Sequence, residues 1–315
     1  MSSEGGNESW GITANLGTTA LGVASQRAAE TAQPHPLVRD EFASVMVAAA
    51  NQPGWRTMAT GDLSWMGPED DKGRRAAETG RNYVATRTVF FDDYCAAAVA
   101  AGIGQIVILA SGLDARSYRL QCLNDIDVYE IDQPEVLAFK DSVLAAHGAA
   151  AVAALRLVPI DLRDDSWPSV LGAAGFETSR PTAWLAEGLL PYLGSDEHDR
   201  LFTAVTALSA PGSQLAAEVY PNAEVSFGET RMGKWREGAK DMNDTIGVSM
   251  DVASFIKDDD ATDTAVWLSR RGWVVETLDS REEMTRHRRP IPVDVMDIAP
   301  VSSFVTARLG RMANG

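Results

Sequence analysis

The chain has 315 residues, a formal net charge of −16 at pH 7 and two cysteines. This length allows a full hydrophobic core and exceeds that of a minimal α/β domain. The acidic balance argues against nucleic acid and anionic membrane surfaces as partners, because contacts to phosphate need clustered Lys and Arg. Two cysteines cannot build a disulfide framework, and the sequence shows no cluster of metal ligands. The apolar run at residues 45–50 is too short for a membrane span and badly placed for a signal peptide, so we expect a cytoplasmic protein.

The N-terminal part of the chain, residues 1–80, is expected to form a helical cap. Residues 1–9 are polar and rich in Gly and Ser, a composition typical of disorder. The spacing of apolar residues predicts three helices, at residues 12–32, 39–50 and 76–101. Residues 54–75 between them are interpreted as a loop, in which Trp55 and Trp65 act as packing anchors.

The most informative stretch of the sequence begins at the end of the third helix. Residues 106–109 form a short apolar, β-branched run, which is typical of a strand buried on both faces. Small residues around Gly112 follow, where the backbone can approach a ligand without side-chain obstruction. A short helix is expected next, and a second strand at residues 128–131 ends on Asp132. In doubly wound sheets an acid at that position binds ribose hydroxyls, so this pattern predicts a nucleoside-binding site.

The residues around Gly112 also limit which nucleoside fits. A dinucleotide fingerprint needs G-x-G-x-x-G, whose glycines and helix N-terminus hold a pyrophosphate. The turn here reads A-S-G-L-D-A, with a single glycine, and Asp114 would repel phosphate while tolerating a sulfonium or an amine. The sequence contains no P-loop motif either. S-adenosylmethionine (SAM), which carries adenosine and no phosphate, is therefore preferred to NAD or to a degenerate site.

The alternation of strands and helices continues and predicts a mostly parallel sheet of seven strands. The five later strands are expected at residues 156–160, 182–186, 214–219, 273–278 and 303–309. The helices between them are expected at residues 134–147, 164–174, 196–209 and 265–272. Ser111 or Asp114 is expected to cap the short helix after the first strand. Ser195 is expected to cap the helix at residues 196–209.

The whole chain, residues 1–315, is interpreted as a single α/β domain with a Rossmann-like sheet. Residues 81–220 are its cofactor-binding core. Residues 266–315 supply a closing helix and two closing strands, with an antiparallel pairing at the edge of the sheet. Residues 221–265 are rich in charge, Gly and Met and break the rhythm, so we interpret them as an insert or lid over the site.

Three acids stand at or just past the ends of successive predicted strands: Asp132, Asp161 and Glu187. Any one of them could be a helix cap or a solvated loop residue, but three in order point to one crevice. Asp132 suits the ribose diol, and Asp161 with the Leu162 amide suits the amine and ring nitrogen of adenine. Glu187 could face the methionine ammonium or the ribose edge.

Four segments of the sequence are similar to those of a known family. They read V-I-L-A-S-G-L-D-A-R-S-Y-R-L, V-Y-E-I-D-Q-P, V-P-I-D-L-R-D-D and T-A-W-L-A-E-G-L-L-P-Y-L. The chain resembles the mycobacterial family of SAM-dependent methyltransferases, which is related to leucine carboxyl methyltransferases and polyketide O-methyltransferases. The resemblance runs from about Trp10 to the end of the chain. It departs at Pro191, where close relatives often have methionine.

The resemblance implies a class I methyltransferase fold with SAM as the cofactor. It also implies cofactor contacts at six residues: Arg87, Gly112, Asp132, Asp161, Leu162 and Glu187. Among them, Arg87 in Y-V-A-T-R-T matches the position at which the leucine carboxyl branch binds the cofactor carboxylate. Arg116 and Arg119 are competitors for that role, although their helix can point them away from the cleft. The alternative interpretation of Arg87 is an exposed arginine on a helix.

The sequence offers no obvious general base. Its four histidines fall in predicted loops or on polar helix faces and are expected at the surface: His35, His147, His198 and His287. Methyl transfer to a carboxylate needs no base, because the acceptor is already anionic and in-line positioning supplies most of the rate. A phenol or alcohol acceptor usually needs one. Tyr192 and Tyr220 lie near the predicted cleft and are interpreted as wall residues, so no catalytic residue is assigned.

These observations predict a SAM-dependent methyltransferase that works without a metal and O-methylates a small-molecule metabolite at a carboxylate or hydroxyl group. Two alternatives stay open at this point. One is a Rossmann-type NAD(P)-dependent oxidoreductase, against which the missing glycines speak. The other is a SAM-binding protein without turnover.

Overall fold

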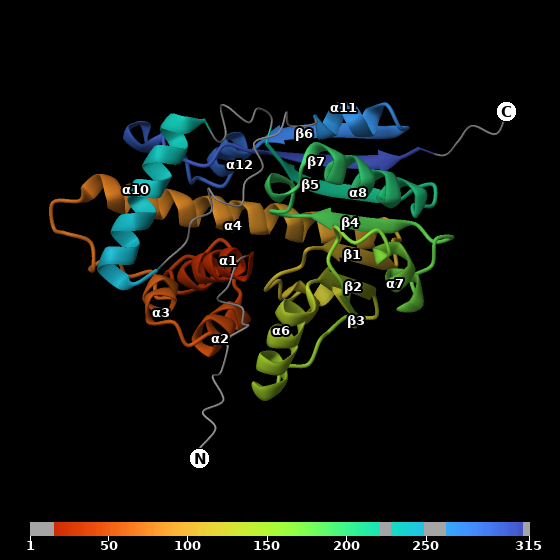
Figure 1. The fold of residues 1–315 in the computed structure, drawn as a ribbon, viewed down its shortest axis with the longest axis horizontal. Helices are drawn as coiled ribbons and strands as arrows, with labels where there is room; N and C mark the ends of the chain where they lie inside the picture. The colour runs from red at the N-terminus through yellow and green to blue at the C-terminus, as the bar shows by residue number, and fades with distance from the viewer. Residues whose placement is uncertain (1–15, 221–227, 249–262, 311–315) are drawn as a thin grey trace, which may run out of the picture.

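The computed structural model describes residues 16–220, 228–248 and 263–310, which form a layered α/β fold (Figure 1). Its seven-stranded sheet has the order β3-β2-β1-β4-β5-β7-β6. The strands are β1 (Gln105–Leu109), β2 (Asp127–Asp132), β3 (Ala154–Pro159), β4 (Thr182–Ala186), β5 (Gln214–Val219), β6 (Trp273–Asp279) and β7 (Ser303–Leu309). Strands β1 to β5 are parallel, and β7 lies antiparallel between β5 and β6. The predicted fold class is confirmed.

Most of the described helices lie close to the predicted ranges, and three are additions. They are α1 (Leu16–Thr31), α2 (Glu41–Ala49), α3 (Pro53–Ala59), α4 (Asp71–Ala100), α5 (Arg116–Arg119), α6 (Pro134–Ala146), α7 (Trp167–Ala173), α8 (Ser195–Ala207), α10 (Glu229–Ile246), α11 (Thr264–Ser269) and α12 (Ser280–Arg286). Three short 3-10 turns are η1 (Gln121–Leu123), η2 (Leu190–Tyr192) and η4 (Val293–Val295). Helices α3, α10 and α12 are the additions. Helix α10 falls inside the predicted insert, whose role as a lid stays a prediction.

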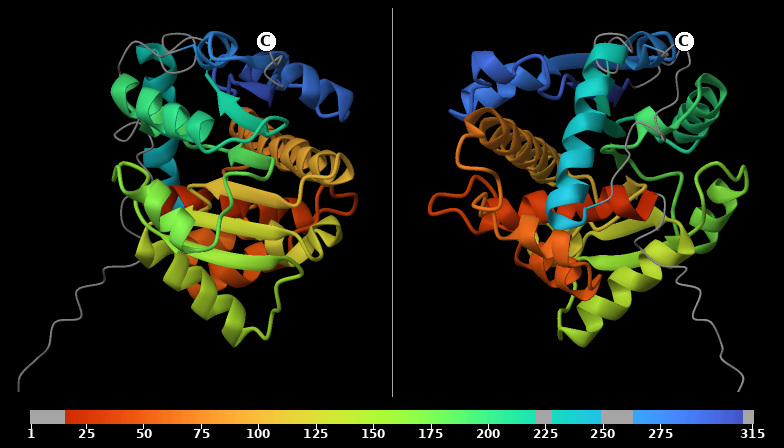
Figure 2. Two further views of the ribbon diagram at one scale, coloured as in Figure 1. Left: turned by 90° about the vertical axis from the view of Figure 1, so that its right-hand side faces the viewer. Right: turned by 60° about the vertical axis from the view of Figure 1, so that its left-hand side comes forward.

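Apolar side chains cover both faces of the sheet, as the continuous hydrophobic runs of β1 and β4 require. On one face α4 packs Phe91 against Ile106 of β1. On the other face α7, α8 and α11 contribute to the cluster that contains Trp184 of β4, whose ring lies 6.5 Å from that of Trp167 and 5.5 Å from that of Phe176. The two further views in Figure 2 show helices on either side of the strands. Every residue of β1 and β4 is buried.

The central strand β1 fixes where a ligand can bind. It pairs with β2 on one side and with β4 on the other, so the order in which the chain adds strands reverses between β1 and β4. Ligands of doubly wound sheets bind outside the carboxyl ends of the strands at such a switch point. Helices α1, α2 and α3 gather beyond one end of the sheet (Figure 1), and their core includes Leu113, which follows β1 directly.

Helix α3 and the early start of α4 correct the loop expected at residues 54–75. Pro53 occupies the first turn of α3, where a missing N–H costs nothing. Trp55 is buried in the cap, as expected of a packing anchor. Helix α4 begins earlier than predicted because the Asp70 carboxylate accepts a hydrogen bond from the Gly73 N–H at 2.8 Å.

The caps of two further helices also differ from the prediction. Helix α5 starts after Ala115, although Asp114 still accepts a hydrogen bond from the first N–H of the helix at 2.7 Å. Gly194, not Ser195, precedes α8, and its N–H donates to the Glu197 carboxylate at 2.9 Å. The disorder expected for residues 1–9 falls outside the described residues.

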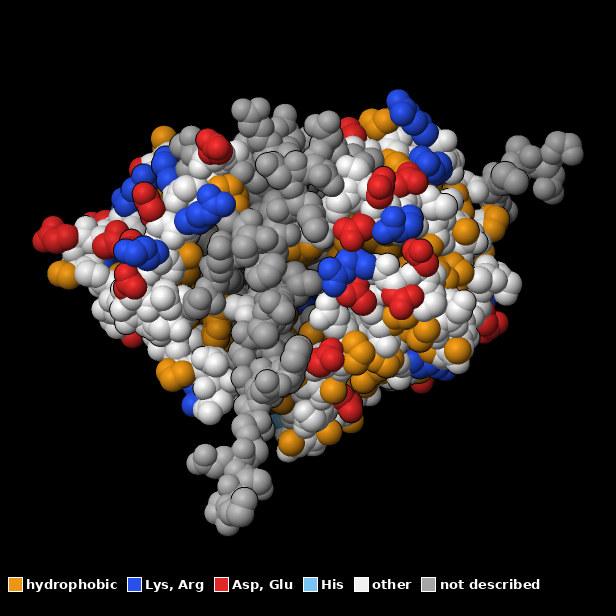
Figure 3. All heavy atoms as spheres, in the orientation of Figure 1, with side chains coloured by type: hydrophobic (Ala, Val, Ile, Leu, Met, Phe, Trp, Pro, Cys, Tyr) orange, Lys and Arg blue, Asp and Glu red, His pale blue; other side chains and the backbone are white. Residues whose placement is uncertain are grey.

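The described surface carries charges of both signs. Lys and Arg side chains are interspersed with Asp and Glu on the face shown in Figure 3. Within the described ranges, no helix combines the length and the apolar content needed to cross a membrane. Cys95 is buried and Cys122 is half-buried, and both are free thiols in this structure.

His198 is not at the surface, and this expectation was wrong. Its side chain is only 5% exposed between α8 and α11, with Nε2 3.0 Å from Thr264 Oγ1. Its ring packs 4.7 Å from that of Phe202 and 6.3 Å from that of Trp267. The covering helix lies 66 residues further along the chain, so the pattern of α8 alone cannot reveal it. Burial lowers the pKa of His198 from 6.5 to about 4.

We predict that His198 makes the free energy of unfolding fall at acidic pH. The pKa of about 4 in the folded chain lies below 6.5, so the neutral ring contributes its full stability above pH 6.5 and loses it as pH falls through 4. The loss between neutral pH and about pH 5 should be about 2 kcal/mol. Denaturant titrations of His198→Gln should show a smaller pH dependence than wild type, and exposed His147→Gln should not. Equal dependence in His198→Gln and wild type would contradict this.

Candidate functional site

A cavity of about 220 Å³ opens at the carboxyl ends of β1, β2 and β4. All six residues expected to contact a cofactor line it: Arg87, Gly112, Asp132, Asp161, Leu162 and Glu187. They come from α4 and from the loops or ends of four different strands. The structure therefore brings the whole predicted set together, although their sequence positions span a hundred residues.

The loop after β1 forms the floor of this cavity. Ala110 and Gly112 have positive φ angles of 52° and 51°, and for a residue with a Cβ this conformation is strained. The Ser111 N–H donates to the Ile131 carbonyl at 3.0 Å, and the Gly112 N–H donates to Asp132 Oδ2 at 2.6 Å. The tight turn thus joins the ends of β1 and β2 through the predicted ribose acid.

Asp132 and Asp161 differ in electrostatic environment. Burial raises the pKa of Asp132, against hydrogen bonds from the N–H groups of Gly112 and Gln133. Arg163 holds the pKa of Asp161 below its usual value through hydrogen bonds to its carboxylate, which also lies 3.4 Å from Gln133 Nε2. Asp132 is thus a half-buried acceptor held by two backbone N–H groups, whereas Asp161 keeps a partly exposed ion pair at the cavity edge.

Arg87 reaches the cavity from α4 and contacts two carboxylates. Its Nε donates to Glu187 Oε1 at 2.9 Å, and its Nη1 donates to Glu218 Oε2 at 3.1 Å. Nη2 takes part in neither bond. The residue is 7% exposed, so the alternative interpretation of Arg87 as an exposed helix arginine is wrong. Burial alone would raise the pKa of Glu187, but Arg116 and Arg87 keep that pKa below its usual value.

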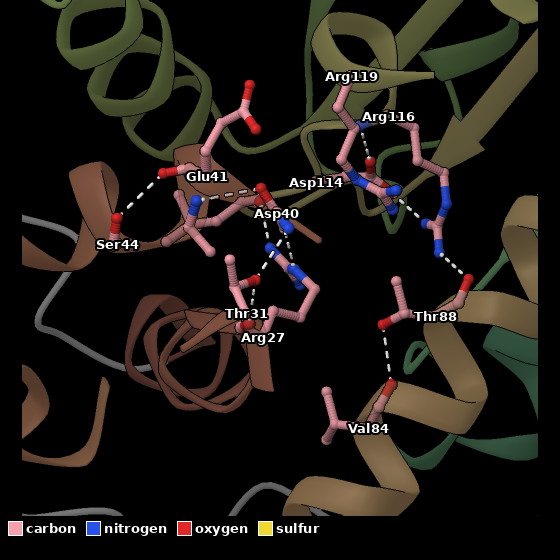
Figure 4. A network of polar contacts seen from close by, with 12 residues as sticks. Arg27, Thr31, Asp40, Glu41, Ser44, Val84, Thr88, Asp114, Arg116 and Arg119 are labelled. Atoms are coloured by element: carbon pink, nitrogen blue, oxygen red, sulfur yellow. Dashed lines mark hydrogen bonds and ion pairs between the residues drawn. The ribbon is translucent and has the colours of Figure 1, made fainter. Parts of the chain in front are cut away.

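Arg116 and Arg119 point toward α4 and are absent from the described lining of the cavity. Arg116 lies 2.7 Å from Asp92 and 2.8 Å from Glu187, and also pairs with Asp114. Arg119 binds Asp92 through two nitrogens at 2.6 and 2.7 Å. Figure 4 shows Arg116 between Asp114 and the backbone of α4. Burial opposes ionisation of Asp114, but Arg116 lowers its pKa to about 2.

The sequence analysis missed Arg27, a cation of the cap that also lines the cavity. Its Nε lies 2.8 Å from Asp40 Oδ2, a pair that Figure 4 shows, and its Nη2 donates to the Leu113 carbonyl at 2.6 Å. Arg27 lies in an Ala-rich helix, far upstream of every predicted strand. Only the packing of α1 on the loop after β1 places it here.

Tyr192 and Tyr220 line the cavity as predicted. Tyr192 forms a hydrogen bond with Thr19 of α1, and burial raises the pKa of its hydroxyl. Burial and the neighbouring Glu218 raise the pKa of Tyr220 well above its usual value. Both phenols therefore stay neutral and can donate hydrogen bonds.

The described wall includes no histidine, and no group of His, Cys, Asp and Glu among the described residues could hold a metal.

A mostly parallel seven-stranded sheet, an antiparallel β7 inserted beside β5, and acids at the strand tips of the switch point define a class I SAM-dependent methyltransferase. The model of the leucine carboxyl methyltransferase family matches residues 20–206. The chain therefore belongs to the leucine carboxyl methyltransferase family.

Several mycobacterial relatives extend this match over nearly the whole chain. A protein of Mycolicibacterium paratuberculosis is 50% identical over 96% of this chain and 94% of its own length. A protein of Mycolicibacterium smegmatis is 49% identical over 96% of this chain and 95% of its own. Both carry the name S-adenosyl-L-methionine-dependent methyltransferase. The chain is thus a SAM-dependent methyltransferase and not the NAD(P)-dependent oxidoreductase considered above.

We predict that Gly112→Ala weakens SAM binding by roughly tenfold or more. Its φ of 51° disfavours a side chain, and the added Cβ would lie 3.3 Å from the Ala20 Cβ, so the loop or α1 must shift by a few tenths of an ångström, which disturbs the hydrogen bond from the Gly112 N–H to Asp132. Gly148→Ala is the matched control, because Gly148 also has a positive φ of 75° but its Cβ would meet no described atom within 4 Å. Calorimetric titration with SAM should separate the two variants, and equal affinities would contradict the prediction.

Proposed function

We propose that SAM lies in this cavity with its ribose on Asp132 and its adenine against Asp161 and the Leu162 amide. The half-buried, ionisable Asp132 carboxylate suits a pair of hydroxyl donors. The Ser111 hydroxyl supports the assignment, because it is buried at the cavity wall without a partner among the described residues. Such a group is expected where a ligand supplies the missing hydrogen bond.

We extend the proposal to the methionine end of the cofactor, where the wall carries Arg27, Arg87 and Glu187. A cofactor carboxylate near these acids needs a cation, and a guanidinium can bind both of its oxygens. Arg87 fits this role through Nη2, since Nε and Nη1 are held by Glu187 and Glu218. Glu187 is the acid nearest to Arg87 on the wall and suits the ammonium group.

The methyl acceptor that fits this cavity best is a small-molecule carboxylate. The cofactor supplies an electrophilic methyl group, and the acceptor must attack it as an anion or lose a proton on the way. The described wall contains no histidine that could act as a general base. Glu187 is held between two arginines that lower its pKa, which makes it a weak base. An acceptor that arrives already ionised avoids this need. Neutral Tyr192 and Tyr220 could donate hydrogen bonds to its oxygens.

The test of this function is a comparison of matched acceptors. The purified protein with methyl-labelled SAM and no added metal is offered small carboxylic acids and the corresponding alcohols and phenols. Label is expected in the acids only, as methyl esters that release labelled methanol in alkali. An alkali-stable methylated product, or transfer that requires a metal, would overturn the proposal.

We predict that Arg87→Ala removes most of the preference of the protein for SAM over its decarboxylated analogue. If Arg87 binds the carboxylate, deleting that group and deleting the guanidinium remove the same interaction, so the two losses should not add. The wild type should prefer SAM by roughly tenfold or more.

Arg27→Ala is the matched control, since Arg27 lines the same cavity but is bound to Asp40 and the Leu113 carbonyl. Binding constants of the four protein–ligand pairs, measured by calorimetry, complete each cycle. An undiminished preference in Arg87→Ala, with loss in Arg27→Ala, would move the role to Arg27.

A further inference from the structure

A buried ion pair lies beneath the loop that forms the cavity floor. Lys140 of α6 and Glu130 of β2 have side-chain exposures of 1% and 0%, and their Nζ and Oε2 atoms are 2.5 Å apart. The second carboxylate oxygen of Glu130 accepts a hydrogen bond from Ser117 Oγ at 2.7 Å. Neither residue of the pair lines the cavity. Burying two charges is costly, and an apolar pair of similar volume often gives equal or greater stability.

The pair has one further contact, which points to the cofactor site. Lys140 Nζ lies 3.2 Å from the carbonyl oxygen of Asp114. The preceding carbonyl, that of Leu113, accepts from Arg27 of α1. Two buried cations therefore hold consecutive carbonyls of the loop, one from the cap and one from beneath. This loop contains the strained turn at Ala110 and Gly112, which needs such support to persist.

We propose that Lys140 is a positioning residue for cofactor binding, which fixes the loop after β1 so that the Gly112 N–H and Asp132 meet. The proposal rests on the SAM site assigned above. Lys140 acts in two ways. Its hydrogen bond holds the Asp114 carbonyl, and its charge lies close enough to Asp132 to favour the ionised carboxylate.

The charge effect can be followed because the surroundings of Asp132 are simple. Burial raises its pKa, and nearby Asp161 raises it further. The N–H groups of Gly112 and Gln133 lower it, and the Lys140 ammonium lowers it as well. Cofactor hydroxyls bind the ionised form, so affinity falls when pH drops through this pKa. Removing the ammonium should move that loss of affinity to higher pH.

The test replaces both charges in the full-length protein. Glu130→Met with Lys140→Met leaves no uncompensated buried charge, so the fold should survive. SAM affinity at neutral pH should fall by roughly tenfold or more, and its acid limb should move to higher pH. KM for SAM should rise more than kcat falls. Asp132→Asn, which cannot ionise, should bind weakly and lack the acid limb altogether.

A second variant separates the two effects and covers the case in which the first fails to fold. Glu130→Gln with Lys140→Gln keeps a donor for the Asp114 carbonyl but removes the charge, so affinity should partly return while the shifted acid limb remains. Arg156→Met is the matched control: it removes an ion pair at the other end of β2 and leaves Asp127 paired with Arg180 at 2.9 Å.

The control should bind SAM as the wild type does, with the same pH profile. If the paired Met variant binds SAM like the wild type at every pH, Lys140 has no positioning role and the proposal is overturned. An unshifted acid limb in the paired Gln variant would overturn the charge effect. Failure of the wild type to bind SAM would overturn the cofactor assignment instead, so the two failures are distinct.

Discussion

The structure of the site depends on one carboxylate, Glu187 at the end of β4, which contacts two buried guanidinium groups. Arg87 comes from α4 and Arg116 from the turn after β1, so a single acid ties the covering helix to the centre of the sheet. Removing one partner of such a pair leaves a buried charge and costs about 3–5 kcal/mol. Asp92 of α4 also binds Arg116, so a second ion pair connects the helix to the segment after β1. These ion pairs of Arg116 help to fix the position of the adjoining loop that contains Gly112.

The same network sets the sign of the field inside the cavity. Around the Arg87 and Arg116 guanidinium groups lie three carboxylates, those of Asp114, Glu187 and Glu218. Arg119 and Asp92 pair with each other, as do Arg27 and Asp40 at the cap, so they add no excess charge. The charge balance of this network beside the cavity is therefore negative. A methyl donor with a sulfonium and an ammonium group is favoured there, and phosphate is not, which agrees with the acidic turn A-S-G-L-D-A.

The sequence allowed the sheet and the acids at its edge to be predicted, because both depend on local patterns. An apolar run followed by a glycine turn defines β1, and Asp132 follows from counting along the next strand. The remaining features depend on contacts between distant segments. Arg27 and Glu218 meet their partners across more than eighty residues of chain, and His198 is buried by a helix that its own segment cannot reveal. Helix α3 was missed because Pro53 can start a helix as well as end one.

The two ion pairs of Arg87, with Glu187 and with Glu218, fix the position of this side chain in a strongly charged pocket. Glu187 and Glu218 fix the guanidinium plane through Nε and Nη1, and Tyr83, which also binds Ser302, donates to Glu218 from the same helix α4. The rotamer entropy of a long side chain is therefore lost during folding and not during binding. In the proposed site a cofactor carboxylate would meet a guanidinium whose orientation Glu187 and Glu218 already fix. Preorganisation of this kind depends in part on a carboxylate outside the described lining, so Glu218 matters to the site although it lies behind the described wall.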